Sequence, residues 1–516
     1  MLVRALPASA AALLSACALA NRQPAPSASP APTPHAGGTL RIGKLSDVAP
    51  AGAPFLLTPT NLQLFSLVYD TLVTYDAQFV PQPRLAASWE WSSDARRLTL
   101  KLRPNVKFHS GQPFTSTDAK FNLEHLRDPA VASPFRAYAN LMRISAPEPL
   151  VLVIEYDSPV KASFDALAAT FMPDPRSLDD TSAGRGFVGT GPFRFKEWSP
   201  GDHLTVARNT DYWQTGKPYL DQVELRILSD RQAAQVSLET GNVDWLSGVP
   251  GLDARRLQDD ASYQVMLTAT GGTFYYLGLD VTVPALADRR VRQALSFALN
   301  RQRMVDAALT GYGRVASVPW PRFSPGYDAT QDATYGFDLG KARQLLEAAN
   351  WDPDTSLTLA LAGSAPLTGA IAQIYQADLA SIGVKLVLQQ LETVDFLSRL
   401  PSGGFGSLWM NTMAGMNLSP ATFLTSAFTV RVPNTSHFDS RRYRELIGQV
   451  VAETDEQRLK AELHEITQIM LDESFVALIA EATARDAGPE VARAVVRNPT
   501  WNVFGLFAFE DVWLDR

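Results

Sequence analysis

The sequence predicts a mixed α/β protein with more than one lobe, and three features lead to that prediction. The chain has 516 residues, too many for one compact hydrophobic core. Short segments that alternate apolar and polar residues, as half-buried strands do, are interleaved with segments of helical periodicity. Hydrophobic residues make up 46% of the chain and charged residues 19%, so it can bury enough apolar surface to fold as a globular protein.

Strands are predicted wherever this alternation is clear. The first follows Gly37-Gly38, and Leu98-Thr99-Leu100-Lys101-Leu102 shows the clearest pattern. The predicted strands cover residues 39–43, 98–102, 151–154, 223–227 and 384–388.

Helices are predicted from their caps and apolar faces. Asp288 caps a helix over 289–305, with Val291, Leu295, Ala298 and Val305 on one face and Arg289, Arg292 and Arg301 facing elsewhere. Asp338 caps a helix over 339–349, and Asn350 takes the left-handed position that ends it. Two further helices are expected over 370–382, before Gly383, and over 456–471.

The N-terminus has the layout of a secretory signal. Residues 1–16 carry one Arg and a short apolar run that is too short to span a bilayer. Leu14-Ser15-Ala16-Cys17 resembles the lipobox of bacterial lipoproteins, which implies a diacylglycerol on Cys17 and anchoring to a membrane. Residues 17–38 are rich in Ala, Pro and Ser and predict an extended tether. The alternative is an ordinary signal peptide with an incidental cysteine.

Composition argues against several classes of protein. The formal net charge is −7, and no basic run is interleaved with aromatic residues, so nucleic acid is not an expected partner. Cys17 is the only cysteine, which excludes an intrachain disulfide and a Cys-based metal cluster. The six histidines do not form a His-x-x-x-His pair, and we expect neither a metal site nor a cofactor.

Motifs of enzymes lack their required context. Gly184–Gly189 matches the dinucleotide-binding glycine pattern, but Gly191-Pro192 follows where a helix is needed, so we predict a turn. Ser158-Pro159-Val160-Lys161 lacks the companion motifs of penicillin-recognising enzymes, and no Gly-x-Ser-x-Gly elbow is present. We therefore predict no catalytic residues. A secreted hydrolase on the same scaffold is kept as a less favoured alternative.

Several blocks resemble the bacterial extracellular solute-binding proteins of family 5, the receptors of peptide and nickel importers. The most specific block runs from Leu85 to Glu90 and continues over 98–115 as Arg103-Pro104-Asn105-Val106-Lys107-Phe108-His109-Ser110-Gly111 and beyond. Further matches, in the same order as in the family, are Gly189–Phe193, Asn209–Trp213, Gly216–Asp221, Gly241–Asp244, Arg292–Leu295, Lys341–Trp351 and Ala377–Lys385. Trp89, Phe108, Pro113, Trp213 and Tyr219 in these blocks are expected to pack the fold and not to contact ligand.

The resemblance implies a large type II periplasmic-binding-protein fold with two lobes and an extra subdomain in the first. By analogy, lobe I covers 39–271 and 488–516 with the extra subdomain at 58–184, and lobe II covers 272–487. Crossings between lobes fall at 271–281 and 480–488, where glycine suits a hinge. The implied function is a monomeric substrate-binding lipoprotein of an ABC importer in the cell envelope. It would capture a peptide or related small solute and deliver it to membrane permeases.

The ligand region departs from the peptide-binding pattern. Peptide-binding relatives carry a tryptophan and then an aspartate that pairs with the peptide ammonium; here the aligned residues are Met413 and Met416. A buried ammonium without a countercharge is strongly disfavoured, so a metal chelate or another non-peptide solute remains an alternative. Asp395 or another carboxylate is the other source of a countercharge. The predicted ligand contacts are Trp409, Asn411, Met413, Met416, Asn417, Trp320, Tyr275 and Arg136.

Overall fold

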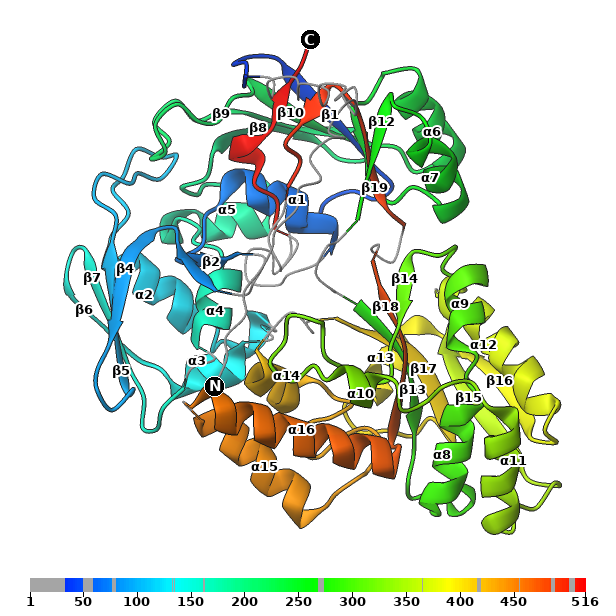
Figure 1. The fold of residues 1–516 in the computed structure, drawn as a ribbon. Coiled ribbons are helices and arrows are strands. Elements are labelled where there is room, and N and C mark those ends of the chain that lie inside the picture. The colour runs from blue at the N-terminus through cyan, green and yellow to red at the C-terminus, as the bar shows by residue number, and fades with distance from the viewer. Residues whose placement is uncertain are drawn as a thin grey trace, which may run out of the picture. The chain divides into compact units, whose positions relative to one another are not determined.

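The computed structural model describes residues 33–49, 59–76, 80–131, 133, 135–160, 163–267, 273–363, 365–414, 419–453, 455–483, 488–500 and 506–516. The chain divides into two compact units, residues 1–34 and 35–516. The described part of the second unit contains strands and helices in alternation, which confirms the mixed α/β class (Figure 1).

A seven-stranded sheet has the strand order β12-β19-β11-β1-β10-β9-β8. Six of its strands come from residues 39–266, and β19 comes from near the C-terminus. β1 pairs in parallel with β10 and β11, and its Leu40 and Ile42 are fully buried. One apolar cluster joins this sheet to α1 and the C-terminal residues, and another joins it to α6 and α7. The elements are β1 (Thr39–Lys44), α1 (Pro59–Val68), β8 (Phe193–Ser199), β9 (His203–Arg208), β10 (Gln222–Ile227), α6 (Arg231–Glu239), β11 (Trp245–Leu246), α7 (Gly251–Gln258), β12 (Tyr263–Met266) and β19 (Glu490–Arg493).

A four-stranded antiparallel sheet, ordered β4-β5-β7-β6, forms from residues between β1 and β8. Its apolar side chains alternate as the sequence predicts, with Leu98, Leu100 and Leu102 of β5 buried. A capping box between Thr115 and Asp118 starts α2. The elements are β2 (Val73–Tyr75), β3 (Pro81–Pro83), β4 (Ala86–Trp91), β5 (Arg97–Leu102), α2 (Ser116–His125), α3 (Arg136–Leu141), β6 (Arg143–Glu148), β7 (Val151–Glu155), α4 (Ser163–Ala169) and α5 (Leu178–Ser182).

A six-stranded sheet, ordered β14-β18-β13-β17-β15-β16, forms from residues 273–482. One face packs with α8, α9, α11 and α12, and the other with α13 to α16. α8 lies beside α11, and α15 beside α16 (Figure 1). The elements are β13 (Thr273–Leu279), α8 (Arg289–Phe297), α9 (Arg301–Ala307), β14 (Gly313–Val315), α11 (Leu339–Ala348), β15 (Ser356–Ala362), α12 (Pro366–Ala380), β16 (Lys385–Leu391), α13 (Thr393–Arg399), β17 (Leu408–Ala414), α14 (Pro420–Ser426), α15 (Arg441–Ala452), α16 (Glu456–Glu473) and β18 (Val476–Ala482).

Short elements complete the described chain. A two-stranded ribbon joins β20 and β21 near the C-terminus. These elements are η2 (Pro129–Val131), η3 (Pro175–Ser177), η4 (Pro284–Leu286), α10 (Ala329–Asp332), β20 (Val496–Arg497), η5 (Phe509–Asp511) and β21 (Trp513–Leu514).

Most of the predicted secondary structure is confirmed, with one correction. β1, β5, β7, β10 and β16 lie where strands are predicted, and Asp288 and Asp338 accept backbone N–H bonds as helix caps. Asn350 has φ 54° and Gly383 has φ 79°, the left-handed conformation expected there. The predicted helix over 289–305 is instead two helices, because Asn300 caps α9 and interrupts the run.

Two arginines of this region lie inside the protein. Arg292 and Arg301 are 3% and 5% exposed. Arg301 donates hydrogen bonds to the carbonyls of Ser296, Ala316, Tyr335 and Leu478, at 2.8–3.2 Å. Burial lowers the pKa of Arg301 to about 10. The guanidinium therefore replaces water as the partner of four backbone carbonyls.

The predicted lobe boundaries remain predictions. Residues 271–272 and 484–487, within the predicted crossings, lie outside the described residues, as do the predicted signal 1–16 and Cys17. The glycine-rich stretch 184–189 is turn and irregular structure, and it precedes β8. The predicted turn is therefore confirmed.

Candidate functional site

Three parallel strands, β15, β16 and β17, end at one edge of the six-stranded sheet. Ala362 pairs with Leu391, and β15 also runs parallel to β17. Ligands of open α/β sheets bind outside the carboxyl ends of the strands. Ala414 is the last residue of β17, and residues 415–418 follow it in the chain. Two predicted ligand contacts, Met416 and Asn417, therefore come directly after the end of this strand in the sequence.

Three predicted contacts, Trp409, Asn411 and Met413, alternate along β17 and share one face. Trp409 pairs with Gly278, where a Cβ would lie 2.1 Å from the indole ring, so glycine leaves room for the tryptophan. The indole is 1% exposed and donates its N–H to the Tyr276 hydroxyl at 3.3 Å. Trp409 therefore packs inside the protein against one face of the six-stranded sheet, and the one donor of its indole is already used.

Met413 is the member of this face closest to the end of β17. It is buried, pairs across the sheet with Phe274, and its sulfur accepts a hydrogen bond from the Thr429 hydroxyl at 3.5 Å. Met416 and Asn417 lie outside the described residues. Asp395, considered as a substitute countercharge, instead pairs with Arg399 on α13 at 2.8 Å.

The remaining predicted contacts are dispersed. Trp320 is 2% exposed, donates to the Thr467 hydroxyl at 2.7 Å and packs edge-on against Phe423. Tyr275 belongs to the apolar cluster on the opposite face of the sheet from Met413. Arg136 begins α3 and is half-buried. The described structure thus brings together Trp409, Asn411 and Met413, and ligand contact by any of the eight stays a prediction.

An arginine that forms no ion pair with any described residue follows α14. Arg431 is half-buried and stacks on the ring of Phe428, 4.3 Å from its centroid. Its buried Nε makes no hydrogen bond, and no described carboxylate lies within ion-pair distance. Burial lowers the pKa of Arg431. Phe428 and Arg431 lie on either side of Thr429 in the chain. The Thr429 hydroxyl contacts the Met413 sulfur, so the charge of Arg431 is two residues away from a direct partner of Met413.

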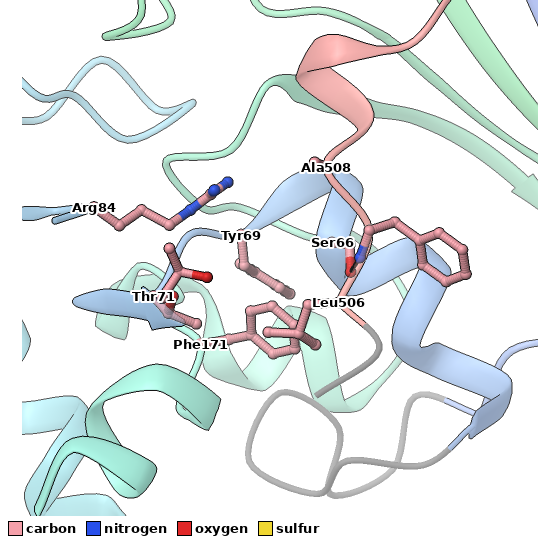
Figure 2. Close-up of a pocket in the computed structure, with 9 residues that line it drawn as sticks. Ser66, Tyr69, Thr71, Arg84, Phe171, Leu506 and Ala508 are labelled. Atoms are coloured by element: carbon pink, nitrogen blue, oxygen red, sulfur yellow. Dashed lines mark hydrogen bonds between the residues drawn. The ribbon is translucent and has the colours of Figure 1, made fainter. Parts of the chain in front are cut away.

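A second feature is a cavity of about 50 Å³ between α1, β2 and the C-terminal segment. Figure 2 shows the side chains that line it. It is lined by Ser66, Tyr69, Thr71, Thr74, Arg84, Phe171, Leu506, Phe507 and Ala508. Ligand pockets usually enclose roughly 300–1,000 Å³, so this cavity is too small to hold a peptide or a chelate. No local sequence pattern points to these residues, because they come from segments far apart in the chain.

The charge of Arg84 beside this cavity is neutralised by a buried network. Asp70 is 1% exposed and accepts from Arg84 at 2.7 Å, and Glu510 binds the other side of the guanidinium at 2.9 Å. Asp70 also accepts from three donors in family-like blocks: Thr190 at 3.0 Å, Tyr212 at 3.3 Å and Trp213 at 3.0 Å. These motif residues therefore hold the fold together, as predicted for Trp213.

His109 joins two other blocks. Its Nε2 donates to the Gly191 carbonyl at 3.0 Å, and its Nδ1 accepts from the Gly189 N–H at 3.3 Å. The bond accepted by Nδ1 requires the neutral ring, and burial lowers the pKa of His109 to about 4. His109 is therefore a neutral clamp on the loop that begins at Gly189.

The described residues contain neither a candidate metal site nor a candidate membrane-spanning helix. Across the stretches that the structure describes, no group of three His, Cys, Asp or Glu side chains is arranged to hold a metal ion. No helix in the same stretches is both long and apolar enough to cross a bilayer.

Known proteins resemble this chain over most of its length. The family model "Bacterial extracellular solute-binding proteins, family 5 Middle" matches residues 80–433. The "Glutathione-binding protein GsiB" of Escherichia coli strain K12 is 27% identical over 430 residues, 80% of this chain and 83% of that protein. The "Nickel-binding periplasmic protein" of the same strain is 28% identical over 460 residues, 82% of this chain and 85% of that one. NikA from Brucella suis, solved with Fe(III)-EDTA, superposes with a TM-score of 0.82 at 25% identity, over 93% of this chain and 100% of that one.

Proposed function

The chain belongs to the bacterial extracellular solute-binding proteins of family 5, and we propose that it is the lipid-anchored receptor subunit of an ABC importer. Membership confirms the predicted family and the periplasmic-binding-protein fold. Its relatives are substrate-binding proteins of ABC importers, which confirms the predicted class of function. The match over residues 80–433 carries the proposal, because it includes both the four-stranded sheet and β17.

The proposed cargo is a peptide or related small solute that is not held by a carboxylate at its ammonium. Met413 and Met416 occupy the aligned positions, and the described Asp395 is paired with Arg399. Arg431, which has no carboxylate partner among the residues that the structure describes, favours a solute that carries a carboxylate or another anionic group. The names of the relatives, a glutathione-binding and a nickel-binding protein, keep a metal chelate as the second candidate.

The proposed capture occurs between two lobes. The seven- and six-stranded sheets are the proposed cores of lobe I (39–271 and 488–516) and lobe II (272–487), with the four-stranded sheet in the extra subdomain (58–184). The solute would bind at the edge of the six-stranded sheet where β15, β16 and β17 end. The family's proteins bind their cargo without transforming it, and we propose the same here.

The proposed location is the cell envelope. Removal of residues 1–16 and acylation of Cys17 would leave the folded unit on a tether of residues 17–38, as a monomer that docks on permease subunits. Labelling with a radioactive or clickable fatty acid tests this anchor. Wild type should incorporate the label and Cys17→Ser should not; equal labelling of both would contradict lipidation at this position.

Native mass spectrometry of the protein purified without denaturation tests the proposed cargo. A bound peptide mixture at high occupancy supports the first candidate and removes the chelate, whereas one metal-containing mass supports the second. Steady conversion of an added solute into product would overturn the proposed function.

Binding of two otherwise identical peptides, one with a free N-terminus and one N-acetylated, tests whether any carboxylate of the protein pairs with the peptide ammonium. We expect the wild type to bind both with affinities within about threefold, a difference of less than 1 kcal/mol. Met416→Asp should shift preference toward the free amine, and Met416→Leu serves as its control. A strong preference of the wild type for the free amine would contradict the proposed cargo.

A further inference from the structure

A buried carboxylate joins the four-stranded-sheet region to the start of α14. Asp165 lies on α4, is fully buried, and accepts hydrogen bonds on both oxygens. Oδ2 accepts from the Ser419 backbone N–H at 2.9 Å and from the Thr422 hydroxyl at 2.6 Å. Oδ1 accepts from the Tyr75 hydroxyl at 3.0 Å. Two of these bonds span more than 250 residues of sequence, and the third stays within the same region.

The surroundings of this contact exclude water. Thr422 is 1% exposed, and one continuous apolar cluster contains Phe164 and Leu167 from α4 together with Phe423 and Leu424 from α14. A second polar contact crosses at the same place, between the hydroxyls of Tyr138 and Thr425 at 3.1 Å. A buried carboxylate is stable only while its donors remain, and separating α14 from α4 would remove both donors to Oδ2.

The position of Ser419 connects this contact to cargo binding. Ser419 directly follows residues 415–418 in the chain, and β17, which carries Met413, directly precedes them. Ser419 also caps α14, because its hydroxyl accepts from the Thr422 N–H at 3.3 Å. Ser419 is thus held by Asp165, and it lies five residues after Ala414, the end of β17, in the chain.

We infer that Asp165, Ser419 and Thr422 form a latch that holds the two lobes together around captured solute. In this inference Asp165 is a positioning residue: it does not touch the solute, and it fastens the start of α14 to the opposite lobe. The inference rests on the proposed function, because it needs two lobes that separate and a solute between them.

Three variants of the full chain separate a latch from a packing contact. Asp165→Asn keeps the shape of the side chain but replaces one acceptor oxygen with an amide donor. Thr422→Val replaces the hydroxyl that contacts Asp165 with a methyl group of similar size. Tyr75→Phe is the matched control, because it removes a bond to the same carboxylate within one lobe and leaves both cross-lobe bonds intact.

Two readouts apply to all three: hydrogen exchange at the backbone amides of residues 419–426, and occupancy of the co-purified solute by native mass spectrometry. In Asp165→Asn and Thr422→Val we expect exchange to rise at least about tenfold and occupancy to fall. Tyr75→Phe should resemble wild type in both. The double variant Asp165→Asn/Thr422→Val should loosen α14 by less than the sum of the two single variants, because both changes remove the Thr422–Asp165 bond.

The outcomes distinguish the latch from the proposed function. Solute bound at wild-type occupancy in Asp165→Asn and Thr422→Val overturns the latch and leaves the receptor function standing. Equal loosening of α14 in Tyr75→Phe also overturns it, because a general loss of packing would then explain the effect. If exchange is faster in Asp165→Asn but neither it nor the wild type retains any solute, the contact between α4 and α14 stands and the proposed function, with the latch that rests on it, is overturned.

Discussion

Asp70 is the residue whose loss should most weaken the region around Arg84. Asp70→Asn removes the negative charge that faces Arg84 and places an amide donor among side chains that already donate: Thr190, Tyr212 and Trp213. Breaking one partner of a buried ion pair typically costs about 3–5 kcal/mol. Glu510 still pairs with Arg84, so we expect a loss of about 3 kcal/mol, at the lower end of that range.

Urea unfolding followed by tryptophan fluorescence measures this loss. The matched control is Asp157→Asn, which removes the partner of Arg143 at a site where the Asp157 side chain is 92% exposed. Surface ion pairs contribute about 0–1 kcal/mol, so the control should unfold near the wild-type midpoint. If Asp70→Asn lowers the free energy of unfolding by no more than Asp157→Asn does, the network is not what holds these motif blocks together.

Three further predictions concern single side chains. His109 has a native pKa of about 4, below its ordinary value near 6.5, so the unfolded chain binds the proton first. The free energy of unfolding should therefore fall as the pH drops from about 6.5 to 4, by at most about 1.4 kcal/mol per pH unit. In urea unfolding at several pH values, His109→Gln should show a smaller dependence on pH than the wild type. Gly189→Ala would place a Cβ 2.2 Å from the Val68 carbonyl oxygen and should lower the melting temperature, whereas Gly186→Ala meets nothing within 4 Å and should lower it much less. Arg301→Met removes hydrogen bonds to four carbonyls and should lower the free energy of unfolding in urea by about 2–5 kcal/mol. An equally small effect of Arg301→Met and the exposed control Arg303→Met would contradict this role.

Local patterns were enough to predict the secondary structure around residues 98–102, 223–227 and 338–350, because alternation and caps act between near neighbours. The helix over 289–305 was predicted too long, because Asn300 was not recognised as a cap between two apolar runs. The burial of Arg301 could not be foreseen, since its carbonyl partners lie as far away as Leu478.

The candidate site was predictable only in part. Alternation along residues 408–414 was enough to place Trp409, Asn411 and Met413 on one face, and family-like blocks pointed to that strand. The Asp70 network and the Asp165 contact were not predictable, because each joins residues separated by more than 100 positions. Such pairs are set by how the sheets pack, which no local sequence pattern encodes.

The central claim is that this protein works by closing two lobes around an unaltered solute. Small-angle X-ray scattering of the solute-free protein, before and after addition of the solute identified by native mass spectrometry, tests it most directly. We predict a decrease in the radius of gyration that saturates at one solute per chain and reverses when the solute is removed. A radius of gyration that stays the same at saturating solute would contradict the claim.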